Sequence, residues 1–166
     1  GLAAVVVTVG GVVIAQQGTD SAARILMQSA NAHITSRTTG FLTEAERTAD
    51  ITSRLITDGT LAIYERDGLM RYMWQQLMAR PTLSGMYVGY EDGSFTYVMR
   101  IGTIAGDQFM FKTIDVQRRA RDTMVTWRDI YYDVITPEAG MIDGFDPRLR
   151  PWYAAAQRGP TSYTTF

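Results

Sequence analysis

The most informative part of the chain is the eight-residue segment Asp146-Pro147-Arg148-Leu149-Arg150-Pro151-Trp152-Tyr153. It brings together two guanidinium groups, two aromatic rings and two prolines, directly after a run of β-like sequence. Arginine holds a carboxylate through two parallel hydrogen bonds, and tryptophan and tyrosine supply apolar walls with a polar edge. Pro151 presets the backbone for a helix start. The segment therefore predicts one side of a small-molecule pocket and does not resemble a catalytic site.

The residues that precede this segment predict an antiparallel sheet. Asp92-Gly93 between two apolar runs is a strong hairpin signal, and Pro81 ends a helix that begins near Leu61. The expected elements after that helix are strands at 86–90, 95–101, 109–116 and 123–135, a loop at 136–148, a helix at 150–157 and an opening strand at 162–166. The fold class is therefore α+β. Because the sheet ends on an opening strand, we expect residues 58–166 to form a module that is incomplete at its C-terminus.

Residues 18–57 predict one long helix on which this module is carried. From Thr19 to Ile56 there is no proline and only one glycine, Gly40. A seven-residue spacing links Met27, Ile34, Phe41, Thr48 and Leu55. This spacing is typical of a narrow seam for a partner helix, which would make the protein a homodimer. An amphipathic helix packed only on its own domain explains the pattern equally well.

The N-terminal run at residues 2–15, LAAVVVTVGGVVIA, carries no charge. A membrane span needs about 20 apolar residues, so we expect residues 1–17 to be the end of a membrane helix. A signal-peptide core is the second interpretation, because Val13-Ile14-Ala15 is a tolerable cleavage site. A buried helix is the third.

The composition is that of a single globular domain. Of 166 residues, 46 % are hydrophobic and 20 % are charged, and the formal net charge is −1. Acids and bases are intermixed, so we expect no nucleic-acid partner. The sequence has no cysteine, no Ser/His/Asp set, no phosphate loop and no metal motif. We therefore expect no catalysis, no cofactor and no metal in this chain.

The order of the elements and two motifs resemble the double Cache family, the extracytoplasmic sensor domains of bacterial receptors. The motifs are YVGYEDGSF at residues 87–95 and DPRLRPWY at residues 146–153, and the resemblance covers nearly the whole chain as the N-terminal part of such a domain. It implies a PAS-like antiparallel sheet on a long helix, facing the periplasmic or extracellular side of the bacterial inner membrane. It also implies a small-metabolite ligand, namely an amino acid, an amine or an organic acid. The output would be a cytoplasmic chemoreceptor, kinase, diguanylate cyclase or adenylate or guanylate cyclase domain, and the hairpin looks most like versions attached to nucleotide cyclases.

The resemblance further implies which residues bind the ligand. In the amino-acid-sensing members an Arg-x-Trp segment contacts the ligand carboxylate, which assigns that role to Arg150 and Trp152. Those members have a tyrosine five positions before the arginine. Here that position is Phe145, so one hydroxyl contact is absent.

The residues themselves leave other assignments open. Arg150 is either a ligand contact or a staple that pairs with Asp146 or Asp143 to hold the loop. Trp152 and Tyr153 point in different directions at a helix start, so one of them should face the pocket. Tyr131 and Asp133 would share one strand face and are the expected opposite wall.

Two functions follow from these patterns. The first is a ligand-sensing module of a membrane receptor. The alternative is a ligand-independent dimerisation module with a degenerate pocket, which the phenylalanine at position 145 favours.

Overall fold

The computed structural model describes residues 4–9, 40–41, 43–104, 106–117 and 122–158. Within them, six strands form one antiparallel sheet in the order β1-β2-β3-β4-β5-β6, so each strand pairs with its neighbours in sequence. The strands are β1 (Ala4–Val9), β2 (Leu83–Gly89), β3 (Phe95–Thr103), β4 (Gly106–Asp115), β5 (Asp122–Arg128) and β6 (Val134–Ile142). The helices are α2 (Arg66–Ala79), the 3-10 turn η1 (Pro147–Leu149) and α3 (Pro151–Arg158), and residues 43–57 are also helical (helix 43–57). The predicted α+β class with an antiparallel sheet is confirmed.

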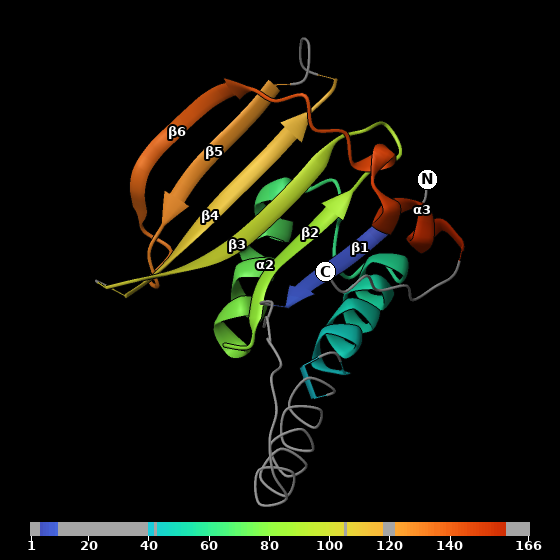
Figure 1. The fold of residues 1–166 in the computed structure, drawn as a ribbon, viewed down its shortest axis with the longest axis horizontal. Helices are drawn as coiled ribbons and strands as arrows, with labels where there is room; N and C mark the ends of the chain where they lie inside the picture. The colour runs from blue at the N-terminus through green and yellow to red at the C-terminus, as the bar shows by residue number, and fades with distance from the viewer. Residues whose placement is uncertain (1–3, 10–39, 42, 105, 118–121, 159–166) are drawn as a thin grey trace, which may run out of the picture.

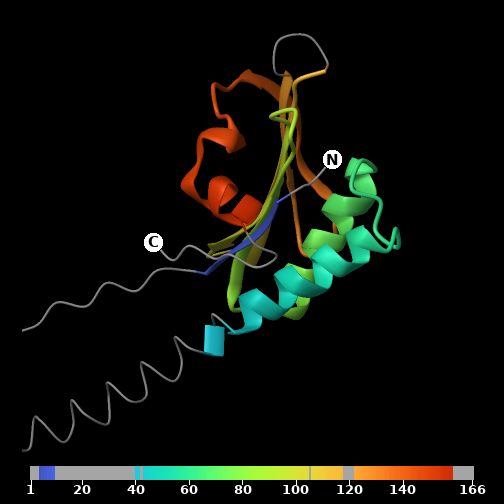
Figure 2. The same ribbon diagram turned by 90° about the vertical axis from the view of Figure 1, so that its right-hand side faces the viewer.

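The sheet lies between two helical layers. Figure 2 shows α2 and helix 43–57 on one side of the sheet and η1 with α3 on the other. Figure 1 shows the strands fanning out from β1 beside α3 to β6 at the opposite edge. Because side chains alternate between the two faces of a strand, each face can build a separate core.

The core on the α2 side consists mainly of aliphatic residues and methionines, and it also contains the buried aromatic residues Tyr90, Phe109 and Phe111. Leu69, Met73 and Leu77 follow one another at four-residue spacing along α2 and are fully buried. They pack against the sheet residues Met86 and Val88, which are two positions apart on β2 and are also fully buried. The apolar face of α2, which repeats every three to four residues, therefore packs on the apolar face of β2, which repeats every two residues.

The core on the α3 side is aromatic. Tyr87, which lies between Met86 and Val88 in the sequence, points to this face and packs with Phe95, Trp152 and Tyr153. Ile114 of β4 completes the buried set. The segment 146–153 thus closes the second face of the sheet.

The N-terminal apolar run differs from its prediction. Residues 4–9, which we assigned to the end of a membrane helix, form strand β1 and pair with β2, with Val5 opposite Val88 and Val7 opposite Met86. The strand sequence is AVVVTV, and β-branched side chains favour extended backbone over helix. Residues 10–17 lie outside the described residues. Within the described residues, no helix has both the length and the apolarity that a membrane crossing requires.

The predicted strand at 123–135 is wrong in its extent. The chain instead turns at residues 129–133 between β5 and β6, and Tyr132 adopts a left-handed backbone with φ 73°. Oδ1 of Asp129 accepts the backbone N–H groups of Tyr131 (2.8 Å) and Asp133 (2.9 Å), so this side chain builds the turn. The apolar residues on both sides of the turn gave the appearance of one continuous strand.

Helix 43–57 packs on its own domain. Ala45, Thr48 and Thr52 are buried, and the hydroxyl of Thr52 lies 3.0 Å from that of Tyr72 on α2. Thr48 occupies one position of the predicted partner seam, and it is buried within this domain. The earlier seam positions Met27 and Ile34, and the predicted strand at 162–166, lie outside the described residues.

Candidate functional site

The two sequence motifs pack directly against each other on the α3 side of the sheet. A Cβ atom added to Gly89 would lie 2.9 Å from Pro147 Cβ and 2.9 Å from Trp152 Cη2. Gly93 in the β2–β3 turn has φ +90°, and the guanidinium of Arg148 lies over it, 3.0 Å from an added Cβ. Gly89 is therefore required by the close approach of the segment 146–153 to the hairpin, and Gly93 is required by its left-handed backbone.

Arg148 stabilises the contact between the segment 146–153 and the hairpin. Its Nε donates to Asp146 Oδ1 (3.0 Å) and its Nη2 to Asp146 Oδ2 (2.7 Å), which is the two-bond geometry of an arginine–carboxylate pair. Its Nη1 reaches the carbonyl oxygen of Glu91 at 3.4 Å. Hydrogen bonding to Asp146 raises the pKa of the Arg148 guanidinium. The Asp146 carboxylate is almost fully buried and also accepts the Arg148 backbone N–H at 3.0 Å, so it caps η1 as well.

A second acidic side chain of the loop is also engaged. Asp143 pairs with Lys112 of β4, the only lysine of the chain, and its Oδ1 accepts the Phe145 backbone N–H at 2.8 Å. The two carboxylates that we considered as partners of Arg150 are therefore held by Arg148 and Lys112.

Arg150 is placed differently from Arg148. Its guanidinium carbon lies 4.6 Å from the centroid of the Phe145 ring, and the residue is exposed. Among the described residues no ion pair joins Arg150 to a carboxylate. The Lys112 ammonium lies 5.7 Å from the centroid of the same ring, so two cationic groups lie close to Phe145. Sequence reasoning missed Lys112, although a single lysine among sixteen basic residues was a signal.

An aromatic cluster lies beneath these cations. The Trp152 and Tyr87 rings are 4.7 Å apart, and the Phe95 and Phe145 rings are also 4.7 Å apart. Tyr153 is only 3 % exposed, and its hydroxyl has no hydrogen-bond partner in the described part of the chain. Burial raises the pKa of Tyr153 and also that of Tyr87. Both hydroxyls therefore stay protonated at neutral pH and can act as donors.

The structure gathers four of the six predicted site residues and separates the other two. Phe145, Arg150, Trp152 and Tyr153 lie together on the α3 side. Tyr131 and Asp133 belong to the β5–β6 turn and line a cavity against α2, on the other side of the sheet. They do not form a wall opposite Arg150, because a turn at 129–133 replaces the predicted strand.

The cavity beside the β5–β6 turn has a volume of about 710 Å³. Arg71 of α2 and Arg128 of β5 line it together with Tyr131, Tyr132 and Asp133. Neither arginine was singled out by the sequence, because one lies in a helix and the other in a strand without a motif around it.

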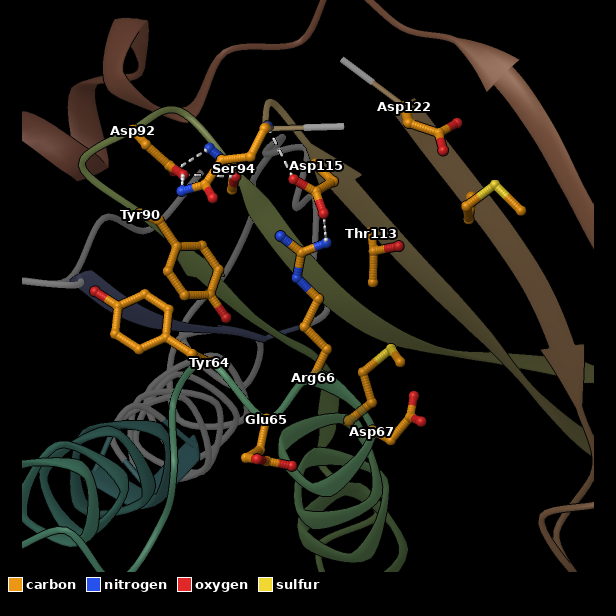
Figure 3. Close-up of a pocket in the computed structure, with 13 residues that line it drawn as sticks. Tyr64, Glu65, Arg66, Asp67, Tyr90, Asp92, Ser94, Thr113, Asp115 and Asp122 are labelled. Carbon is orange, nitrogen blue, oxygen red and sulfur yellow. Dashed lines mark hydrogen bonds and ion pairs between the residues drawn. The ribbon is translucent and has the colours of Figure 1, made fainter. Parts of the chain in front are cut away.

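A second cavity, of about 610 Å³, lies where α2 begins and is drawn in Figure 3. Arg66 reaches from α2 to Asp115 of β4 at 2.8 Å, and the Tyr64 and Tyr90 rings stand 5.8 Å apart beside it. Its lining is acidic, with one arginine and the five carboxylates Glu65, Asp67, Asp92, Asp115 and Asp122. In the described ranges, no three acidic or histidine side chains are grouped so as to hold a metal ion.

No family model, no curated protein and no solved structure matches this chain. Function has therefore to be inferred from the side chains themselves.

Proposed function

We propose that this domain senses a small metabolite that carries a carboxylate, and that the carboxylate binds at Arg150 on the α3 side of the sheet. In this proposal the domain is a PAS-like, Cache-type module of a bacterial membrane receptor. It faces the periplasmic or extracellular side and passes its signal to a cytoplasmic domain such as a nucleotide cyclase, kinase or chemoreceptor.

The observation that carries the proposal is the division of roles between the two arginines. Arg148 is bound by a nearly buried carboxylate and by a carbonyl oxygen, whereas the described residues offer Arg150 only the face of Phe145. A guanidinium that lies over an aromatic ring keeps its N–H edge for a further acceptor. A ligand carboxylate fits this edge, and the Lys112 ammonium, which is paired with Asp143, lies 5.7 Å from the centroid of the same ring.

Two further features support a binding role. The buried Tyr153 hydroxyl has no partner among the described residues, and a buried polar group without a partner is destabilising unless a ligand or water satisfies it. The two motifs that carry the resemblance also contact each other through Gly89 and Gly93.

The proposed location rests on the resemblance alone. Residues 4–9 pair with β2, so this part of the apolar run does not support a membrane helix.

The experiment is a thermal-shift screen of amino acids, amines and organic acids on purified protein that contains residues 1–166. A ligand that binds the folded state raises the melting temperature by mass action. We expect a carboxylate compound to raise it for the wild type and not for Arg150→Ala. Arg54→Ala is the matched control, because it removes an exposed arginine from helix 43–57 and should leave the shift intact. If no carboxylate compound of the screen gives a shift that is lost in Arg150→Ala, Arg150 is rejected as the binding group, and no shift across the screen would reject the sensing function.

A further inference from the structure

A second group of cations lies on the opposite side of the sheet, around Tyr132. The guanidinium carbon of Arg71 is 4.5 Å and that of Arg128 is 4.3 Å from the centroid of the Tyr132 ring. Arg128 also donates from Nη1 to the Tyr132 carbonyl oxygen at 2.8 Å. Tyr132 is the only non-glycine residue of the described chain with a positive φ, 73°. A backbone of this kind persists only where its surroundings hold it.

Neither arginine pairs with a carboxylate of the described residues. In the part of the chain that the structure describes, Arg54, Arg66, Arg100 and Arg148 each form an ion pair with an aspartate. Arg71 and Arg128 form none, although Asp67 stands four residues before Arg71 and lines the same cavity. An arginine at that spacing commonly pairs with such a residue on a helix surface.

The surroundings leave room for a ligand beside both arginines. The cavity that they line measures about 710 Å³, and Tyr131 at its rim is 77 % exposed. Both guanidiniums use part of their donor capacity on Tyr132, Arg128 through Nη1 to the carbonyl oxygen and Arg71 to the side chain. An arginine has five N–H donors, so the remaining N–H groups can donate to an oxyanion. A carboxylate and a phosphate group present the same acceptor geometry to such a fork.

We propose that the cavity between α2 and the β5–β6 turn is a second binding site, in which Arg71 and Arg128 hold the carboxylate or phosphate group of a small anionic ligand. The site is separate from the one at Arg150, because the sheet lies between them. A ligand here bridges α2 to the β5–β6 turn, and its occupancy therefore strengthens the packing of the helical layer on the sheet.

The test measures the melting temperature in inorganic phosphate, in succinate and in chloride at equal ionic strength. The first two probes separate a phosphate from a carboxylate ligand, and chloride gives the effect of salt alone. Arg71→Gln is the main variant, since Arg71 is exposed on α2 and glutamine is a good helix former. Arg54→Gln is the matched control on helix 43–57. Arg128→Lys keeps the charge of Arg128 and removes its planar fork.

We expect phosphate or succinate to raise the melting temperature of the wild type above its value in chloride. The rise should be lost in Arg71→Gln, reduced in Arg128→Lys and retained in Arg54→Gln. It should also be retained in Arg150→Ala, which separates this site from the proposed sensing site. Phosphate stabilises many proteins by exclusion from their surface. An equal rise in Arg71→Gln, or no rise in the wild type, would overturn the second site, and a rise lost in Arg150→Ala would assign the anion to the α3 side instead.

Discussion

At the scale of single residues, the absence of a side chain at Gly89 decides how closely the two motifs approach. A Cβ atom at position 89 would lie 2.9 Å from an atom of Pro147 and 2.9 Å from an atom of Trp152. Both distances are shorter than van der Waals contact. Pro147 and Trp152 are themselves buried, so neither can move aside freely. Gly89 is therefore a packing requirement of the α3 side and not a requirement of backbone conformation.

We predict that Gly89→Ala destabilises the protein by about 1–3 kcal/mol, the usual range for an overpacked core. Urea unfolding followed by far-UV circular dichroism measures this change. Gly68→Ala is the control, because its added Cβ meets only Glu65 Cβ at 4.0 Å and alanine favours the helix that Gly68 occupies. Gly68→Ala should raise the stability by up to about 1 kcal/mol. Equal stability of wild type and Gly89→Ala would show that the two motifs are not packed as described.

The unpartnered hydroxyl of Tyr153 gives a second prediction. Removing a buried polar group that has no hydrogen bond should leave the free energy of unfolding unchanged or raise it by about 1 kcal/mol, so Tyr153→Phe should not be destabilising. Tyr90→Phe is the contrast, because the Tyr90 hydroxyl donates to the Ile63 carbonyl at 2.8 Å and its loss should lower the stability by about 1 kcal/mol. Both values come from the same urea titration. A clear loss of stability in Tyr153→Phe would mean that its hydroxyl is already satisfied.

At the scale of elements, local chemistry predicted the hairpin and the start of α3, whereas α2 begins at Arg66 and not near Leu61. Asp92-Gly93 marked the β2–β3 turn, and the proline at position 151 marked the first residue of α3. β1 was missed because its pairing with β2 is decided by a strand far along the chain, and an uncharged apolar run fits a helix or a strand equally. The β5–β6 turn was missed because its signal is a single aspartate without glycine or proline beside it.

We predict that the Asp129 side chain holds the β5–β6 turn. Asp129→Ala removes the acceptor of two backbone N–H groups and should destabilise the protein by about 1–2 kcal/mol, while Asp129→Asn keeps an acceptor oxygen and should lose less than half of that. Equilibrium unfolding of the two variants side by side gives the comparison. If both lose the same stability, the charge of Asp129 and not its acceptor oxygen maintains the turn.

At the scale of the whole molecule, the two faces of the sheet carry different chemistry. The core on the α2 side is mainly aliphatic, with three buried aromatic residues, and is bordered by the two cavities. The core on the α3 side is almost entirely aromatic and lies next to the cations Arg150 and Lys112. From the sequence, we predicted that the segment 146–153 forms one side of a pocket. The sequence could not predict which of two arginines so close together would pair with Asp146, because that depends on how η1 turns Arg148 back toward the hairpin.

The buried tyrosines predict an alkaline limit to stability. Burial raises the pKa values of Tyr87, Tyr90, Tyr97 and Tyr153, whereas tyrosine in the unfolded chain ionises near pH 10. As the pH rises, these tyrosines therefore lose their protons first in the unfolded state. The free energy of unfolding should be insensitive to them below about pH 9, and it should fall as the pH rises past about 10. The midpoint of urea unfolding, measured at several pH values from about 7 to about 11, tests this prediction. Tyr87→Phe should make the fall shallower, and an identical slope in that variant would contradict the assignment.

The different roles of the two arginines are tested most directly by comparing Arg148→Ala with Arg150→Ala in equilibrium urea unfolding in the absence of any ligand. If Arg148 fastens the segment 146–153 to the hairpin and Arg150 is left for a ligand, Arg148→Ala should lower the unfolding midpoint and Arg150→Ala should leave it unchanged. A midpoint lowered by Arg150→Ala as much as by Arg148→Ala, or lowered by Arg150→Ala alone, would show that Arg150 is a structural residue and would remove the basis for a ligand carboxylate at that position.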